Sequence, residues 1–118
     1  MPTIGLGVIG AGNMAEGLLR GAIAANVIDC NAVMVSDPDF SRRQLFTREL
    51  GVTTSEDNSA AAAAPRVLLA VKPQVIGRVL EGIAQAVRPD ATVISIAAGV
   101  RTDFIAEKLG GRDRKSVV

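Results

Sequence analysis

The fold is decided by residues 3–15, which read Thr3-Ile4-Gly5-Leu6-Gly7-Val8-Ile9-Gly10-Ala11-Gly12-Asn13-Met14-Ala15. The first part of this stretch, Thr3–Ile9, is a short apolar run that predicts a buried strand. It opens directly onto glycines, and from Asn13 to Asn26 apolar residues recur at the three- and four-residue spacing of one helix face. The stretch therefore predicts a strand, a glycine turn and a helix.

Two glycine patterns overlap in this stretch, and only one can form a phosphate-binding turn. Gly5-Leu6-Gly7-Val8-Ile9-Gly10 matches G-x-G-x-x-G, but it lies inside the apolar run and leaves almost no strand before it. Gly10-Ala11-Gly12-Asn13-Met14-Ala15 matches G-x-G-x-x-A, follows a full strand and opens a helix, as a dinucleotide fingerprint requires. Gly10 would make the tight turn, Gly12 would let the backbone approach a pyrophosphate, and Ala15 would keep the helix close to the strand. The alternative is that these are ordinary turn glycines.

The rest of the chain alternates between apolar runs and helix-forming segments. Further strands are predicted at Ala32–Ser36, Val52–Ser55, Arg66–Val71 and Ala91–Ile96, and further helices at residues 41–50, 60–64, 75–87 and 102–109. Connections this short allow only right-handed crossovers between parallel strands. We therefore predict a doubly wound, mostly parallel α/β sheet of the Rossmann-like kind, with helices on both faces. In its first helix, we interpret Gly17 and Gly21 as packing glycines where the helix meets the sheet.

Length and composition set the limits of this prediction. The 118 residues suffice for one domain, spanning 1–118, with a real hydrophobic core. The chain is 48% hydrophobic with three Phe and no Trp or Tyr, which is typical of buried parallel strands covered by Ala-rich helices. A net charge of +1 without a basic stripe argues against nucleic acid as a partner. One cysteine, Cys30, and no histidine exclude a disulfide framework, a Cys/His zinc site and a His-based triad within the chain.

The N-terminus lacks a charged region, and its apolar run is too short for a signal peptide or a membrane span. We therefore expect a cytoplasmic protein with no membrane partner. At the other end, residues 116–118 resemble the beginning of a strand.

The choice of cofactor depends on the residues after the second strand. Asp37 lies where an acidic residue usually binds the adenosine ribose hydroxyl of NAD, although it could equally be a turn residue before Pro38. Arg42 and Arg43 follow at the start of the next helix, and either could bind the NADP phosphate bidentately or belong to a solvated helix face. The sequence leaves the choice between NAD and NADP open.

Two more segments follow predicted strands directly. In open parallel sheets, ligands bind beyond the carboxyl ends of the strands. Lys72 and Pro73 would form a rigid turn beside the nicotinamide ribose, unless Lys72 is an ordinary surface lysine. The small residues of Ala97-Ala98-Gly99 would let a flat ring lie against the backbone, unless they form a close-packed turn.

Three motifs occur in the same order as in a known family. Ile9-Gly10-Ala11-Gly12-Asn13-Met14-Ala15, Ala70-Val71-Lys72-Pro73-Gln74 and Ser95-Ile96-Ala97-Ala98-Gly99-Val100 resemble the N-terminal half of pyrroline-5-carboxylate reductases. The resemblance implies hydride transfer from NADPH or NADH to 1-pyrroline-5-carboxylate, giving L-proline in the last step of proline biosynthesis. It also implies cofactor contacts at Ile9, Gly10, Ala11, Gly12, Asn13, Met14, Asp37, Asn58, Ala70, Val71, Lys72, Pro73, Ile96, Ala97 and Ala98. Asn58 could instead be only a helix cap.

In the resembled family a helical C-terminal domain follows, which builds the homo-oligomer and holds and protonates the substrate. We expect this domain to be absent here, since the chain stops at Val118. We also expect no catalytic residue among the 118 residues of the chain. One alternative is a truncated dinucleotide-binding module without turnover. Another is an NADP-dependent oxidoreductase of the beta-hydroxyacid dehydrogenase or F420-type NADP reductase kind, against which the second and third motifs argue.

Overall fold

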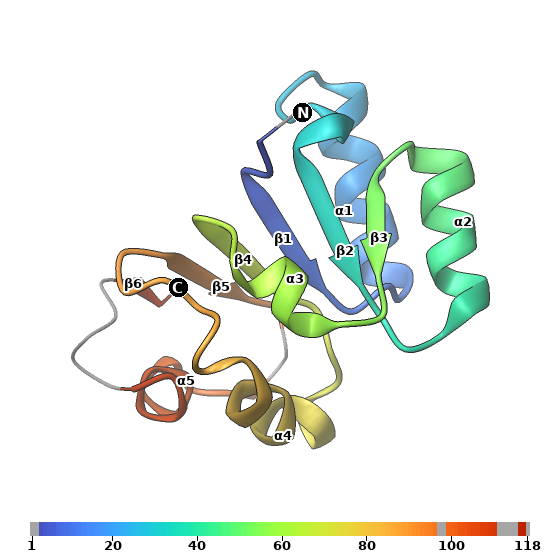
Figure 1. The fold of residues 1–118 in the computed structure, drawn as a ribbon. Coiled ribbons are helices and arrows are strands. Elements are labelled where there is room, and N and C mark those ends of the chain that lie inside the picture. The colour runs from blue at the N-terminus through green and yellow to red at the C-terminus, as the bar shows by residue number, and fades with distance from the viewer. Residues whose placement is uncertain (1–2, 97–98, 111–115, 118) are drawn as a thin grey trace.

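The computed structural model describes residues 3–96, 99–110 and 116–117 of the chain. They contain a six-stranded sheet in the order β3-β2-β1-β4-β5-β6, in which every pairing is parallel (Figure 1). The strands are β1 Leu6–Ile9, β2 Val33–Ser36, β3 Thr53–Ser55, β4 Arg66–Leu69, β5 Thr92–Ser95 and β6 Ser116–Val117. From β1 the chain builds outward through β2 to β3, and it then returns to the other side of β1 with β4. The strand order therefore reverses between β1 and β4, which confirms the predicted doubly wound sheet.

Helices cover both faces of this sheet. They are α1 Asn13–Ala24, α2 Phe40–Leu50, α3 Asn58–Ala62, α4 Pro73–Ile83 and α5 Thr102–Lys108. Figure 1 shows α1 and α2 on one side of the sheet and α3, α4 and α5 on the other. No helix in the described part of the chain combines the length and the hydropathy that a membrane span needs.

The core has two halves, one on each face of the sheet. Val8 packs with Leu19 of α1 and Phe46 of α2, whereas Ile9 packs with Leu80 of α4 and Ile105 of α5. Neighbouring residues of a strand point to opposite faces, so a strand buried on both faces must be apolar at successive positions. This requirement explains the continuous apolar runs in the sequence.

Gly7 explains why the first glycine pattern exists although it forms no turn. It lies within β1, and a Cβ there would overlap the backbone carbonyl of Ala61 in α3. The glycine therefore lets α3 pack directly on the central strand. The turn from strand to helix comes later in the chain, because β1 ends at Ile9 and α1 begins at Asn13.

Two local predictions need correction. Asp57 caps α3 by accepting a hydrogen bond from the Ser59 amide, so Asn58 is the first residue of that helix and not its cap. The prediction that Gly17 and Gly21 pack against the sheet is wrong, because both are exposed. No described atom outside the neighbouring backbone of α1 itself lies within 4 Å of a Cβ built on either. The buried residues of α1 are Ala15 and Leu19, which lie on the apolar face of the helix.

Candidate functional site

The glycine turn lies where the strand order reverses, against the residues that follow β4. Gly10 has a φ of +108°, and a Cβ on it would lie 2.7 Å from the carbonyl oxygen of Ala70. The Gly10 amide donates to the Ser36 carbonyl at 2.8 Å, and the Ala70 amide donates to the Ile9 carbonyl at 2.8 Å. The turn is thereby fixed to the ends of both neighbouring strands, and it is this position that requires glycine.

The amino terminus of α1 is open beyond this turn. Gly12 is its N-cap with extended backbone, and among the described residues no side chain caps the helix. Apart from its two chain neighbours, no described residue has an atom within 4 Å of a Cβ built on Gly12. The first helical bond is donated by Glu16 to the Gly12 carbonyl, so the amides of the first turn before Glu16 lack a partner within the helix. Such a helix end attracts anions through its free N–H groups and its dipole.

A hollow of about 300 Å³ adjoins this helix end. Its volume is at the lower end of the range for small-molecule sites, so it could hold part of a dinucleotide but not all of it. It is lined by Gly12, Asn13, Met14, Ala70, Val71, Lys72, Pro73 and Ile96. All eight belong to the cofactor contacts predicted from the sequence, and they come from three separate strand ends. The structure therefore brings together segments that lie more than eighty residues apart in the chain.

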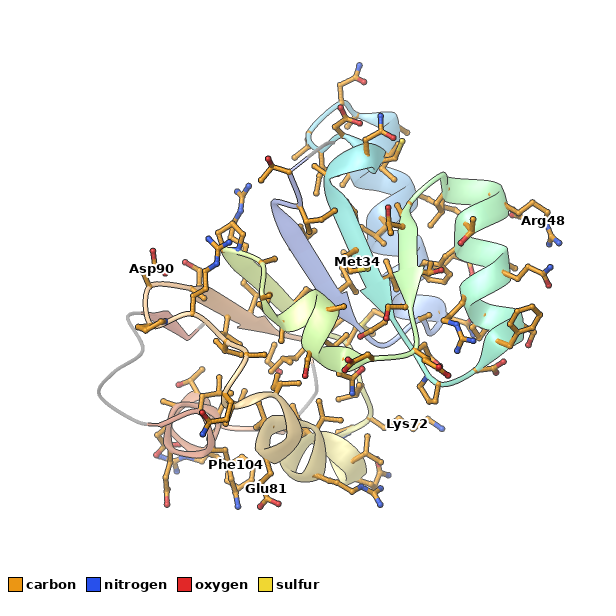
Figure 2. All side chains as sticks on the ribbon, in the orientation of Figure 1. Met34, Arg48, Lys72, Glu81, Asp90 and Phe104 are labelled. Carbon is orange, nitrogen blue, oxygen red and sulfur yellow. The ribbon has the colours of Figure 1, made fainter. Side chains whose placement is uncertain are left out.

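The segment after β4 forms a fixed turn. Lys72 is the N-cap of α4, and Pro73 occupies the first helical position, where its locked φ suits the start of a helix. The Lys72 carbonyl accepts a hydrogen bond from Val75 at 3.0 Å. The Lys72 side chain extends away from the sheet (Figure 2). Lys72 and Pro73 both line the hollow, and Lys72 is exposed to solvent.

Asp37 follows β2 and contacts the glycine turn. Its Oδ2 accepts the Ala11 amide at 2.7 Å, and its Oδ1 accepts the Asp39 amide at 2.8 Å. The interpretation of Asp37 as a turn residue is therefore confirmed, whereas its binding of an adenosine ribose stays a prediction. Asp37 stabilises the turn that leads to α2, and it also lies beside the glycine turn.

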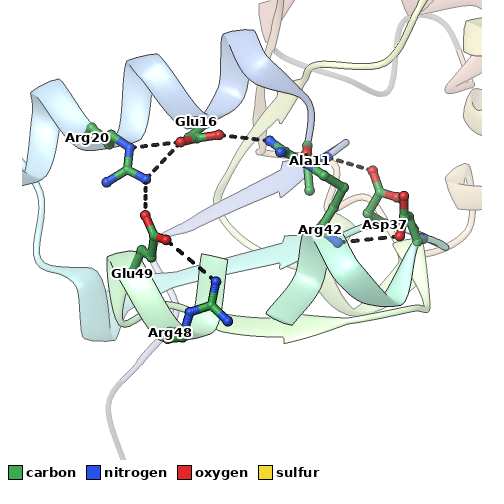
Figure 3. Close-up of polar contacts among 8 residues, drawn as sticks. Ala11, Glu16, Arg20, Asp37, Arg42, Arg48 and Glu49 are labelled. Carbon is green, nitrogen blue, oxygen red and sulfur yellow. Dashed lines mark hydrogen bonds and ion pairs between the residues drawn. The ribbon is translucent and has the colours of Figure 1, made fainter. Parts of the chain in front are cut away.

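Arg42 contacts the same residue of the glycine turn from α2 (Figure 3). Its Nε donates to the Ala11 carbonyl at 2.6 Å, and its Nη2 pairs with Glu16 Oε1 at 2.9 Å. Arg43 instead donates to the Asp37 carbonyl at 2.8 Å and lies over the Phe40 ring. Of the two arginines, Arg42 is the one on the glycine turn.

Glu16 is a residue of this region that the sequence motifs did not indicate. Its Oε2 accepts both Arg20 Nε and Arg20 Nη2, and Arg20 Nη2 also pairs with Glu49 Oε1 at 2.6 Å. Hydrogen bonds from Arg20 and then from Arg42 hold the pKa of the Glu16 carboxyl below its ordinary value. The spacing of Glu16 and Arg20 signals an i,i+4 pair in the sequence, but the contact with Arg42 depends on how α1 and α2 pack.

The remaining predicted contacts lie outside the hollow or outside the described residues. Asn58 lines a different hollow with Asp57, Ser59 and Arg78, and its Oδ1 accepts the buried Ser36 hydroxyl at 2.8 Å. Ile9 and Ala11 are buried, so only their backbone can face a ligand. Ala97 and Ala98 lie outside the described residues.

A family model and curated relatives match this chain over most of its length. Residues 5–99 match the model of the family described as NADP oxidoreductase coenzyme F420-dependent. The pyrroline-5-carboxylate reductase of a Synechocystis strain is 45% identical over 100 residues, which are 83% of this chain and 37% of that protein. The chain spans about two fifths of the length of the curated relatives it matches.

Two solved structures resemble this chain closely. A pyrroline-5-carboxylate reductase from Coxiella burnetii has a TM-score of 0.86 at 35% identity, over 97% of this chain and 42% of that one. A Plasmodium falciparum pyrroline carboxylate reductase with NADP bound has a TM-score of 0.80 at 26% identity, over 98% and 41%. The resemblance expected from the three sequence motifs is thereby confirmed. Since the family model covers most of its length, the chain belongs to the family of oxidoreductases described as NADP oxidoreductase coenzyme F420-dependent, and it is similar to pyrroline-5-carboxylate reductases.

Proposed function

We propose that this chain binds NADPH or NADH and presents the nicotinamide for hydride transfer to 1-pyrroline-5-carboxylate, as the dinucleotide-binding part of a pyrroline-5-carboxylate reductase. The observation that carries the proposal is the hollow beside the amino terminus of α1, because three separate predicted segments line it. The relatives support the chemistry, since they are pyrroline-5-carboxylate reductases and one solved structure holds NADP.

Each part of the cofactor has a matching part of the site. The pyrophosphate would lie on the amides of the first turn of α1, where Gly12 has no side chain to obstruct it. The adenosine ribose would lie toward Asp37 and Arg42, which follow β2. The nicotinamide half would lie in the hollow formed by Ala70–Pro73 and Ile96, with Ala97 and Ala98 as further proposed contacts. The cofactor supplies the hydride when bound, and the chain fixes its position and orientation.

We place no catalytic residue in this chain. Its residues 1–118 would constitute the dinucleotide-binding domain of a longer reductase. Groups that hold and protonate the substrate, and the surfaces that build a homo-oligomer, would belong to the part of the relatives that this chain does not match. The product of the complete reaction would be L-proline.

Two measurements test the proposal. Purified chain is titrated with NADPH and with NADH, and proline formation from 1-pyrroline-5-carboxylate is then assayed. We expect binding of at least one cofactor. Binding without turnover would support a dinucleotide-binding module, and turnover would support an enzyme in its own right. If neither cofactor binds, the proposal is wrong.

Coenzyme F420 serves as a further titrant, because the description of the family names it. We expect no binding of F420, since the curated relatives at 34–45% identity are pyrroline-5-carboxylate reductases. Specific F420 binding would instead favour an F420-type reductase.

A further inference from the structure

The guanidinium of Arg42 is shared between the glycine turn and an acidic side chain. It donates through Nε to the Ala11 carbonyl and through Nη2 to Glu16 Oε1 at 2.9 Å. The side chains of Arg42 and Glu16 are 27% and 21% exposed, respectively. Charges at such partly covered positions are screened less by water and salt than charges on an open surface.

We propose that Glu16 is a specificity-determining residue, which disfavours NADPH relative to NADH by competing with the adenosine 2′-phosphate for Arg42. This inference rests on the proposed function. In doubly wound folds the 2′ position of the adenosine ribose is recognised at the end of the second strand, by an acidic residue or by an arginine. Here Asp37 and Arg42 both contact Ala11 at that place (Figure 3). A phosphate bound by Arg42 therefore comes close to the Glu16 carboxylate.

The competition affects the two cofactors differently. The 2′-phosphate of NADPH is an anion that needs the donors of Arg42, one of which Glu16 already occupies. Its charge is also repelled by the nearby carboxylate. NADH carries a neutral hydroxyl at the same place. Because both cofactors carry the pyrophosphate near the first turn of α1, removing the charge of Glu16 should act on both, but more strongly on NADPH.

The surrounding contacts keep the Glu16 carboxylate in this place. Arg20 holds Glu16 Oε2 through two nitrogens, at 2.9 and 2.8 Å. The carboxylate thus cannot turn away from Arg42 without breaking these bonds. The second carboxylate near the 2′ position, Asp37, differs because both of its oxygens accept backbone amides of neighbouring turns. Replacing Asp37 would disturb the glycine turn itself, whereas Glu16 can be changed without losing a bond to that turn.

The test is the dissociation constant of each cofactor for Glu16→Gln, measured by isothermal titration calorimetry at low salt. We expect the NADPH constant to fall about three- to tenfold, while the NADH constant changes less than about twofold. Glu16→Ala should shift the preference in the same direction, and it provides a second variant with high helix propensity. An Arg42→Ala chain should bind NADPH more weakly, and adding Glu16→Gln to it should give a smaller gain than in the parent chain, because only the direct repulsion is then relieved.

Glu49→Gln is the matched control, because its described contacts are with Arg20 and Arg48 at the other end of the same network. We expect its ratio of NADPH to NADH affinity to equal that of the parent chain. An unchanged ratio in both Glu16 variants would overturn the inference. So would weaker NADPH binding, which would mean that Glu16 positions Arg42 for the phosphate. If the parent chain binds neither cofactor, the proposed function itself fails.

Discussion

At the residue scale, Gly10 and Gly12 serve different purposes although they are two positions apart. Gly10 combines a positive φ with close approach to the Ala70 carbonyl, so the fold depends on it. Gly12 has extended backbone and open space beside it, so only a ligand could require its lack of a side chain. The sequence pattern predicts the tight turn at Gly10, which the structure confirms, and it assigns Gly12 to the approach of a pyrophosphate, which stays a prediction.

The two glycines should therefore respond differently to the same substitution. Gly10→Ala places a Cβ against the Ala70 carbonyl in a backbone conformation unfavourable for alanine, and it should lower the free energy of unfolding by about 1–3 kcal/mol. Gly12→Ala should change it by less than about 1 kcal/mol. Urea denaturation followed by circular dichroism measures both. Equal losses of stability in the two variants would contradict the close approach of Gly10 to the Ala70 carbonyl.

At the element scale, the close packing of α3 on β1 depends on one residue without a side chain. Gly7 faces the backbone of Ala61, whereas a Cβ added to Gly5, just before β1, would have Arg66 Nη2 as its nearest neighbour, at 3.8 Å. The periodicity of the sequence predicts the strands and most helices, because that signal is local. It places neither the cap of α3 at Asp57 nor the direction of Gly17 and Gly21, since these depend on how the elements pack.

A pair of substitutions tests this packing. Gly7→Ala should displace α3 and lower the free energy of unfolding by about 3 kcal/mol, because the new methyl group overlaps backbone atoms that cannot move aside. Gly5→Ala makes the same chemical change at a position with room for it, and it should cost less than about 1 kcal/mol. Chemical denaturation of the two variants decides between close packing and a loose contact at this point.

At the scale of the whole molecule, ion pairs join neighbouring helices on both faces of the sheet. Arg20 of α1 pairs with Glu49 of α2, and Lys108 of α5 pairs with Glu81 of α4. A hydrogen bond from Arg20 lowers the pKa of Glu49, and one from Lys108 lowers the pKa of Glu81. These contacts join residues distant in sequence, so no local pattern predicts them. The site follows the same rule: its glycine turn was predictable, but the contact between Glu16 and Arg42 was not.

The lowered pKa values predict the direction of a pH effect. A carboxylate whose pKa is lower in the folded state stabilises the fold fully above its unfolded pKa, about 4.3 for glutamate, and less as pH falls through the folded value. The melting temperature should therefore fall on acidification. It should fall less steeply for a Glu49→Gln, Glu81→Gln double variant, which lacks both pairs. Identical pH profiles of the two proteins would mean that these pairs do not contribute.

The central claim is that the open amino terminus of α1 binds the pyrophosphate of a nicotinamide dinucleotide. The measurement that tests it most directly is calorimetric titration of NADPH and NADH into the parent chain and into Gly12→Val, whose side chain would occupy the space beside that helix end. We predict binding by the parent chain and a loss of about tenfold or more in affinity for the variant, with its unfolding transition retained. Absence of binding of both cofactors to the parent chain, or equal affinity of the two proteins, would contradict the account.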